Sequence, residues 1–431
     1  RFGGFMWQRI YLERLKRDLE RWIERGWVTP AHAQNILSEM DTGAGARHVP
    51  QVLAIMGAVL FGFAAMSFVA ANWAEMPKSI RLLMLFGSLW TAWGAAFFAE
   101  RRGHSAYAEA GVIAGLALFG ANIMLIAQIY HVDAGTPTWL LLWSLVALTA
   151  AWGLPSRSAL AISFLLTTLW STWAVQNESA VHWAFLLPWV AATWLTVQLS
   201  WRAGLHLSLI TLCIWLVASA DRLIDLIGCG QGDLTALYAL ASLLLWIAGL
   251  RISASSLRFG SILETYGMII TFGLIWTLQV HTGDSHAGFK WTALALIGMA
   301  GVGALAFAEV SAARLSLRDY VGLVAAGLGV VLYPLIAEHG NATMLIYAAL
   351  FMALTIWLVA YGTNRHHRIA LNAGLIAFTG ECLYLYFQTL GTLLDTATFF
   401  ALGGIILIAG SLILPRIRRR LVASVNEGEP K

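Results

Sequence analysis

Long apolar segments recur along this chain, and short polar loops separate them. About fourteen segments can be drawn, each close to the roughly 20 residues that an α-helix needs to cross the hydrocarbon core of a bilayer. Because unpaired backbone N–H and C=O groups are costly in lipid, such segments span as helices. The pattern therefore predicts an all-α, polytopic bundle of membrane helices. The segments lie at residues 51–72, 80–99, 106–130, 138–154, 158–176, 181–200, 203–220, 235–250, 258–279, 291–308, 319–337, 342–362, 368–387 and 397–415.

The charged residues of the connecting loops are sorted by side. Alternate loops are basic, whereas the intervening loops carry mostly Asp and Glu, such as Asp133, Glu178 and Asp395. Positive charge in short loops marks the cytoplasmic face, and an even number of spans returns the chain to its starting side. We therefore expect both termini in the cytoplasm. The basic set is Arg101, Arg102, Arg157, Arg202, Arg251, Arg258, Arg314, Arg318, Arg365, Arg368, Arg416, Arg418, Arg419 and Arg420.

Composition narrows the class of protein further. Hydrophobic residues make up 59% of the chain and charged residues only 12%, compared with about 25% charged in soluble domains. The net charge of +4 arises from the loops of one face and leaves no basic stripe for nucleic acid. Cys213, Cys229 and Cys382 show no CxxC or Cys/His spacing. We expect no nucleic acid, disulfide, metal or cofactor.

The sequence predicts three regions. Residues 1–47 are expected to form a cytoplasmic amphipathic helical hairpin and linker, because apolar residues repeat every three or four positions until Gly26, and Thr29–Pro30 then starts a second helix. This hairpin either packs against the bundle or docks a partner or the lipid surface. Residues 48–415 form the transmembrane bundle. Residues 416–431 form a basic cytoplasmic tail.

Three acidic residues lie within apolar segments. Glu109, Glu264 and Glu381 are candidates for substrate or ion binding, because carboxylates in a membrane usually face the bundle interior or a hydrated cavity. The alternative is a structural hydrogen bond that ties neighbouring helices together. Asn122 and Gln128 are further candidates, although amides in membrane helices most often bond to a neighbouring helix.

Four residues predict a polar rim at the outer face. Asn72 and Trp73 close the first segment, and Tyr130 and His131 close the third. This rim is either a substrate vestibule or a docking surface, and simple interfacial anchoring is the alternative. The sequence contains no GxSxG, HExxH or Walker signature, so we predict no catalytic residues.

Three motifs carry a family resemblance. Trp27–Ala33, Ala70–Trp73 with Pro77 following, and Leu125–His131 resemble bacterial membrane proteins of the domain-of-unknown-function family 2157, over about residues 20–150. The resemblance implies a bacterial inner (cytoplasmic) membrane and no established activity. It also implies a possible periplasmic partner protein with a GDYxxLxY motif. This chain lacks that motif, so the partner would be a separate chain.

Two functions from different classes follow. The first is a carrier or flippase-like transporter of a solute or envelope amphiphile, favoured by the number of helices and the buried acids; the apparent lack of buried Arg or Lys argues against anionic substrates. The second is a non-transporting membrane subunit that anchors or stabilises a periplasmic partner. An intramembrane enzyme is a third and weaker hypothesis.

Overall fold

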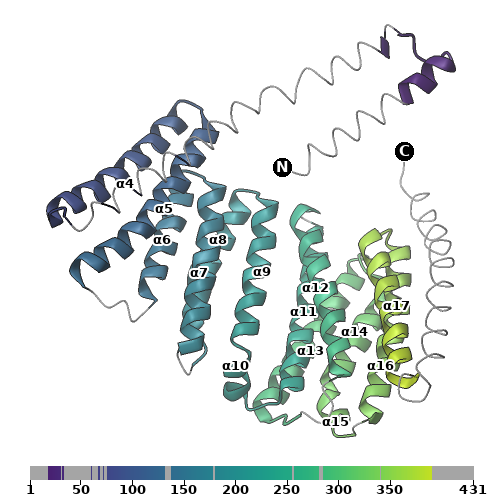
Figure 1. Ribbon diagram of the computed structural model, residues 1–431. Coiled ribbons are helices and arrows are strands. Elements are labelled where there is room, and N and C mark those ends of the chain that lie inside the picture. The colour runs from purple at the N-terminus through teal and green to yellow at the C-terminus, as the bar shows by residue number, and fades with distance from the viewer. Residues whose placement is uncertain are drawn as a thin grey trace. The chain divides into compact units, whose positions relative to one another are not determined.

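The computed structural model describes residues 18–30, 32–33, 60, 67, 71, 75–131, 137–177, 180–254, 257–280, 285–339 and 341–390. Within those ranges every regular element is a helix (Figure 1). The chain divides into two units, residues 1–85 and 86–431, which are described separately. Most of the predicted span 51–72 lies outside the described residues, as do the whole of the predicted span 397–415 and the tail 416–431.

In the first unit, residues 18–24 are helical, as the periodicity predicts. Gly26 ends this helix with a φ of +71°, a conformation that glycine adopts without strain. The N–H of Gly26 bonds to the carbonyl of Ile23 and that of Trp27 to the carbonyl of Trp22, as in a Schellman cap. Arg21 and Asp18 form an ion pair on the described part of this helix.

The remaining helices follow one another with short connections (Figure 1). They are α4 (Lys78–Arg101), α5 (Ser105–Tyr130), α6 (Thr138–Gly153), α7 (Arg157–Asn177), the 3₁₀ turn η1 (Trp183–Phe185), α8 (Leu186–Gln198), α9 (Arg202–Ala218), α10 (Ala220–Ile227), α11 (Gln231–Ser253), α12 (Leu257–Leu278), α13 (Phe289–Ser311), α14 (Leu317–Val331), α15 (Tyr333–Ala337), α16 (Asn341–Asn364) and α17 (Arg368–Leu390).

Eight helices of the described chain are long and apolar enough to cross a membrane, and α9 with α10 makes a ninth if that pair, bent by 59°, is one span. The multi-pass character is thus confirmed, whereas the predicted number of about fourteen is not. The segment predicted at 319–337 is two helices, α14 and α15. Pro334 lies at the start of α15, where its missing N–H cannot continue the ladder of α14.

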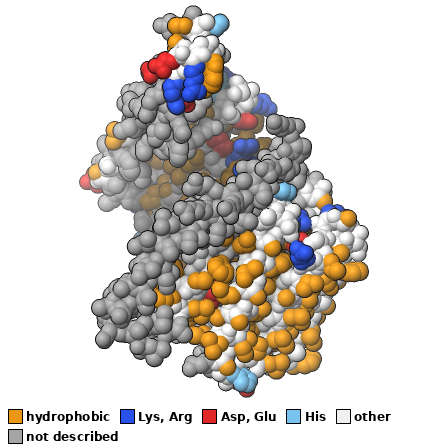
Figure 2. All heavy atoms as spheres, turned by 90° about the vertical axis from the view of Figure 1, so that its right-hand side faces the viewer, with side chains coloured by type: hydrophobic (Ala, Val, Ile, Leu, Met, Phe, Trp, Pro, Cys, Tyr) orange, Lys and Arg blue, Asp and Glu red, His pale blue; other side chains and the backbone are white. Residues whose placement is uncertain are grey.

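The surface of these helices is apolar, as contact with lipid requires. Leu187, Ile297 and Ile376 are exposed to 77%, 70% and 71%. Figure 2 shows hydrophobic side chains over most of the described surface at its lower right, with Lys and Arg gathered at the upper border. We call the helix ends at the arginine loops the arginine end, and the other ends the opposite end.

The larger core lies mainly among α11–α17 and extends to η1, α9 and α10, with α11 at its centre against α12, α13 and α14. Trp246, Tyr333, Tyr347 and Tyr361 are fully buried there. A smaller core lies among α4–α9 around Phe164.

Glycines allow two helix pairs to touch backbone to backbone. In the α11–α12 pair, a Cβ at Gly249 would collide with the backbone of Glu264. A Cβ at Gly267 would lie 2.5 Å from the backbone nitrogen of Trp246. In the α16–α17 pair, a Cβ at Gly362 would likewise lie 2.4 Å from the backbone of Leu371. No hydrophobic driving force acts between helices in lipid. Small residues let the two backbones approach closely, and the resulting van der Waals packing stabilises the crossing.

Buried hydroxyl pairs join consecutive helices. Ser144 and Thr167 link α6 to α7, and Ser242 and Thr271 link α11 to α12. Each pair has an O–O distance of 2.7 Å. These bonds are the interhelical polar contacts expected of a membrane bundle, and they fix the rotation of each helix about its axis.

Candidate functional site

Glu264 makes a polar link between α12 and α16. The hydroxyl of Tyr361 donates to Oε1 of Glu264 at 2.8 Å, and both side chains are buried. The ring of Tyr361 meets that of Trp246 edge-on, with centroids 5.4 Å apart. On its other side the Arg365 guanidinium lies 5.4 Å from the tyrosine ring centroid. The phenol therefore connects a buried carboxylate to the arginine end.

Glu381 makes a second link, between α17 and the end of α12. Nε2 of Gln279 donates to Oε2 of Glu381 at 3.0 Å. Both residues are buried, with Glu381 0% and Gln279 1% exposed. Oε1 of Glu381 and Oε1 of Gln279 have no hydrogen-bond partner among the described residues. This pair is therefore a buried acid–amide contact with two unsatisfied oxygens.

Aromatic residues surround the Glu381–Gln279 pair. The ring of Trp276 on α12 meets that of Tyr384 on α17 edge-on, with ring centroids 5.5 Å apart. Trp276 precedes Gln279 by three residues, so both side chains lie on the same side of this end of α12 and meet α17. The environment is amphipathic: it offers indole and amide donors within an otherwise apolar wall.

The two carboxylates do not form one site. Glu264 lies in the second turn of α12, and Gln279 follows the last residue of the same helix. At 1.5 Å per residue these positions are about 22 Å apart along the axis. Glu264 and Glu381 thus act at different depths of the bundle, one nearer the arginine end and one nearer the opposite end.

Glu109 makes hydrogen bonds from α5 to the start of α7. Its Oε2 accepts from Ser156 Oγ at 2.7 Å, and its Oε1 accepts from the backbone N–H of Arg157 at 3.2 Å. These donors lie at the start of α7, where backbone N–H groups have no partner within the helix. Glu109 therefore caps α7 from α5.

The other predicted residues on α5 belong to neither carboxylate pair, and α5 packs against α6 and α7 within the described chain. Asn122 is buried on α5, whereas Gln128 is exposed. Tyr130 and His131 are exposed at the end of α5, and His131 has a positive φ of 52° as its C-cap. Asn72 and Trp73 lie outside the described residues, so the outer rim stays a prediction.

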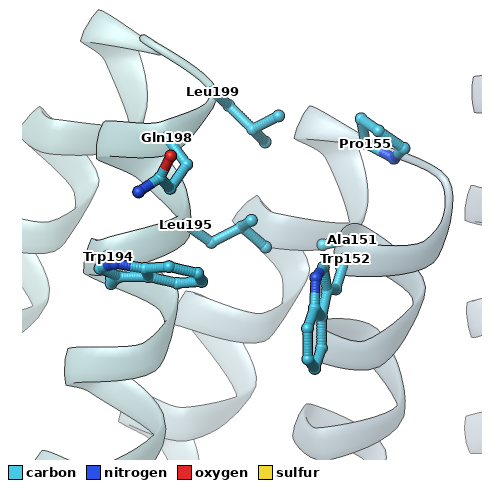
Figure 3. Close-up of a pocket in the computed structure, with 7 residues that line it drawn as sticks. All are labelled: Ala151, Trp152, Pro155, Trp194, Leu195, Gln198 and Leu199. Carbon is cyan, nitrogen blue, oxygen red and sulfur yellow. The ribbon is translucent and has the colours of Figure 1, made fainter.

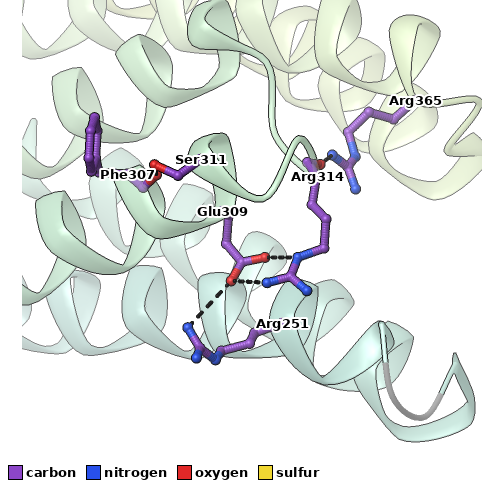
Figure 4. Close-up of polar contacts among 6 residues, drawn as sticks. All are labelled: Arg251, Phe307, Glu309, Ser311, Arg314 and Arg365. Atoms are coloured by element: carbon purple, nitrogen blue, oxygen red, sulfur yellow. Dashed lines mark hydrogen bonds and ion pairs between the residues drawn. The ribbon is translucent and has the colours of Figure 1, made fainter.

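Sequence reasoning missed Glu309, which is fully buried at the arginine end of α13 (Figure 4). Arg314 donates to it twice, from Nε at 2.6 Å and from Nη2 at 3.1 Å. Arg251 of α11 lies 3.7 Å away, and Arg365 donates to the carbonyl of Arg314 at 2.6 Å. We call Arg251, Glu309, Arg314 and Arg365 the arginine clamp. The sequence signal that could have predicted this ion pair is the five-residue separation of Glu309 and Arg314 across the end of a helix.

Asp233 lies in the polar stretch just before the apolar segment predicted at 235–250, yet it is fully buried. Its carboxylate accepts from the N–H of Gly230 at 2.9 Å, from Ser285 Oγ at 2.7 Å and from the N–H of His286 at 2.8 Å. Its backbone carbonyl accepts from the Trp291 indole at 2.7 Å. Asp233 thus fastens the start of α11 to the segment before α13, at the opposite end.

One cavity lies between the arginine ends of α6 and α8 (Figure 3). It has a volume of about 310 Å³ and is lined by Trp152, Pro155, Trp194 and Gln198, among others. None of its lining residues is titratable, so its lining contains no acid, base or charged group that would mark a catalytic site. Across the described residues, no group of three or more His, Cys, Asp or Glu could hold a metal ion.

Replacing Tyr361 with phenylalanine is expected to lower the free energy of unfolding by roughly 0.5–2 kcal/mol, because the buried carboxylate of Glu264 loses its donor. The free energy of unfolding is measured in mixed micelles that contain an increasing fraction of denaturing detergent. Tyr107→Phe is the matched control, since Tyr107 is 72% exposed. Equal stability of the two variants would contradict the link.

Comparison with known proteins finds one family model that matches part of the chain. Residues 20–160 match the family model described as "Predicted membrane protein (DUF2157)". This match confirms the resemblance over the first third of the chain, and it agrees with the apolar helices described above. No curated protein and no solved structure shows significant similarity to the chain.

Proposed function

On the premise that this is a multi-pass membrane protein, we propose that it is a carrier in which Glu381 takes up and releases a proton or a small cation. The observation that supports this most strongly is a pair of buried oxygens, one on Glu381 and one on Gln279, for which the described part of the chain provides no hydrogen-bond partner. Unsatisfied buried oxygens are costly, and a bound proton or cation removes that cost. Ionisable groups in membrane helices commonly form proton and ion pathways.

The proposed chemistry involves the carboxyl group of Glu381 and the side-chain amide of Gln279. When Glu381 is protonated, its O–H can donate to the free oxygen of Gln279 while the amide donates back, so a reciprocal pair is complete. When the proton leaves, the carboxylate keeps the hydrogen bond from Gln279. The loss of one bond weakens the contact between α12 and α17. A proton would thereby change how firmly these helices are joined.

Interrupted helices give the proposal further support. The chain bends by 59° between α9 and α10 at Ser219, and α14 gives way to α15 at Leu332. Discontinuous membrane helices are typical of carriers, because irregular backbone in a membrane is tolerated where it lines a cavity or is buried in protein. The transported molecule belongs to the class predicted from the sequence, a solute or envelope amphiphile.

The proposal includes an orientation. The arginine end faces the cytoplasm of a bacterial inner membrane, with both termini on that side, because short basic loops remain cytoplasmic. Residues 1–47, 48–415 and 416–431 keep their proposed roles as cytoplasmic hairpin, membrane bundle and basic tail.

Water accessibility tests the carrier. Cys213, Cys229 and Cys382 are replaced, and Glu381→Cys is labelled with a membrane-impermeant thiol reagent in intact cells and in inside-out vesicles. We expect labelling from at least one side, because a carrier must open a hydrated path to the coupling group. Leu371→Cys is the matched control on the same helix, since Leu371 is 0% exposed in the core.

The outcome separates the two functions. Labelling of Glu381→Cys with none of Leu371→Cys supports a carrier. The same weak labelling of both, in protein that still folds, contradicts it and favours the subunit that anchors a periplasmic partner. That second function draws on Tyr130 and His131, which are exposed at the opposite end of α5.

A further inference from the structure

Two cavities adjoin at the arginine end, and Arg318 lines both. The first is polar, has a volume of about 640 Å³, and includes Arg314, Arg318, Arg365 and Asp319 in its lining. The second, also about 640 Å³, runs between α14 and α16 and includes Val321, Gly322, Leu350, Ala353 and Trp357. A polar cavity and an apolar groove that share a residue form one amphipathic recess.

The polar cavity has an excess of positive charge. Three arginines face one carboxylate, that of Asp319. Arg314 is bonded to Glu309, and Arg365 donates to the carbonyl of Arg314. Arg318 is exposed and makes no hydrogen bond or ion pair that is found within the described part of the chain. A guanidinium so placed is available for an anionic oxygen, and arginine matches phosphate in geometry.

The apolar groove is suited to a hydrocarbon chain. Its wall on α14 includes Leu317 and Val321, which are 69% and 58% exposed. The ring of Trp357 lies so close to Gly322 that a Cβ there would collide with it, which makes the indole the floor of the groove. The groove starts at Arg318, near the start of α14, and continues past Val321 and Ala325 along that helix.

We propose that this recess binds one anionic phospholipid, with its phosphate at Arg314, Arg318 and Arg365 and an acyl chain between α14 and α16. Basic pockets between membrane helices on the cytoplasmic side are suited to acidic lipid headgroups. A soluble anion would use only the polar cavity, whereas the groove of similar volume beside it fits the tail of an amphiphile. The site is independent of the carrier proposal, since Glu381 lies on another helix and near the other end.

Lipid titration tests the site. The purified full-length protein is titrated in detergent with phosphatidylglycerol, and with phosphatidylcholine as the neutral comparison, and bound lipid is counted by native mass spectrometry. We expect phosphatidylglycerol to bind more tightly. Arg318→Gln should weaken that binding about fivefold, since a basic residue near the headgroup contributes about 1 kcal/mol. Arg102→Gln is the matched control: Arg102 is also exposed at the arginine end, and we expect no change.

A second variant separates the lipid from a free anion. Ala353→Trp fills the groove without altering charge, and we expect it to weaken phosphatidylglycerol binding while a folded melting profile is retained. Inorganic phosphate is added as a competitor. Unchanged lipid binding in Ala353→Trp together with full displacement by phosphate would overturn the proposal in favour of a soluble-anion site. Equal binding of both lipids, or equal effects of the Arg318 and Arg102 substitutions, would overturn it outright.

Discussion

Replacing Asp233 with alanine is expected to lower the free energy of unfolding by roughly 2–5 kcal/mol, because each buried donor left unsatisfied costs about 1–3 kcal/mol. The substitution removes the acceptor of two backbone N–H groups, those of Gly230 and His286, and of the Ser285 hydroxyl. All of them lie at the junction that fastens α11 to α13. Unfolding in mixed micelles, followed by tryptophan fluorescence, gives the measurement.

The control for Asp233 is Asp225→Ala. Asp225 is exposed on the neighbouring α10, so its loss should change the free energy of unfolding by less than about 0.5 kcal/mol. Both substitutions remove one negative charge at the same end of the bundle. If the two variants unfold together, the hydrogen bonds of Asp233 carry no stability and the effect is one of charge alone.

The second large effect is expected at Gly249. A methyl group there would collide with the backbone of Glu264, and backbone cannot move aside as the tip of a flexible side chain can. Gly249→Ala should therefore push α11 from α12 and destabilise the protein by about 1–3 kcal/mol, the range for overpacking a dense core. Thermal unfolding in detergent measures the loss as a lower melting temperature.

Gly273 on α12 supplies the matched comparison. A Cβ at Gly273 meets nothing within 4 Å, and alanine is about 1 kcal/mol better than glycine in a helix. Gly273→Ala should be neutral or slightly stabilising. A loss of stability in Gly273→Ala as large as in Gly249→Ala would show that the cause is not the close contact of the two backbones.

The positions of many helices could be predicted from the apolar segments, because a long run of apolar residues indicates both a helix and a lipid environment. The segment predicted at 258–279 corresponds to α12, and that at 368–387 to α17. The bend at Ser219 and the break before Pro334 were missed. Hydropathy averages over a whole span, and a local interruption inside an apolar run hardly changes that average.

The polar contacts were less accessible to sequence reasoning. Glu264 and Glu381 stood out because acids within apolar runs are rare, but their partners Tyr361 and Gln279 are 97 and 102 residues away. Glu309 and Asp233 lie at helix ends, where a charge normally reaches water. Only the packing of distant segments buries them, and no local pattern reports that packing.

The two carboxylate links have a mechanical consequence. Tyr361 holds α12 to α16 at one level, and Glu381 holds it to α17 at another. The close contacts at Gly249 and Gly362 clamp α12 to α11 and α16 to α17. While Glu381 keeps its bond to Gln279, α12 is fixed at two well-separated points, so these four helices resist tilting and sliding against one another. Among the described helices, relative movement in that state is then expected at the borders of the group, where α12 meets α9 and α11 meets α13 and α14.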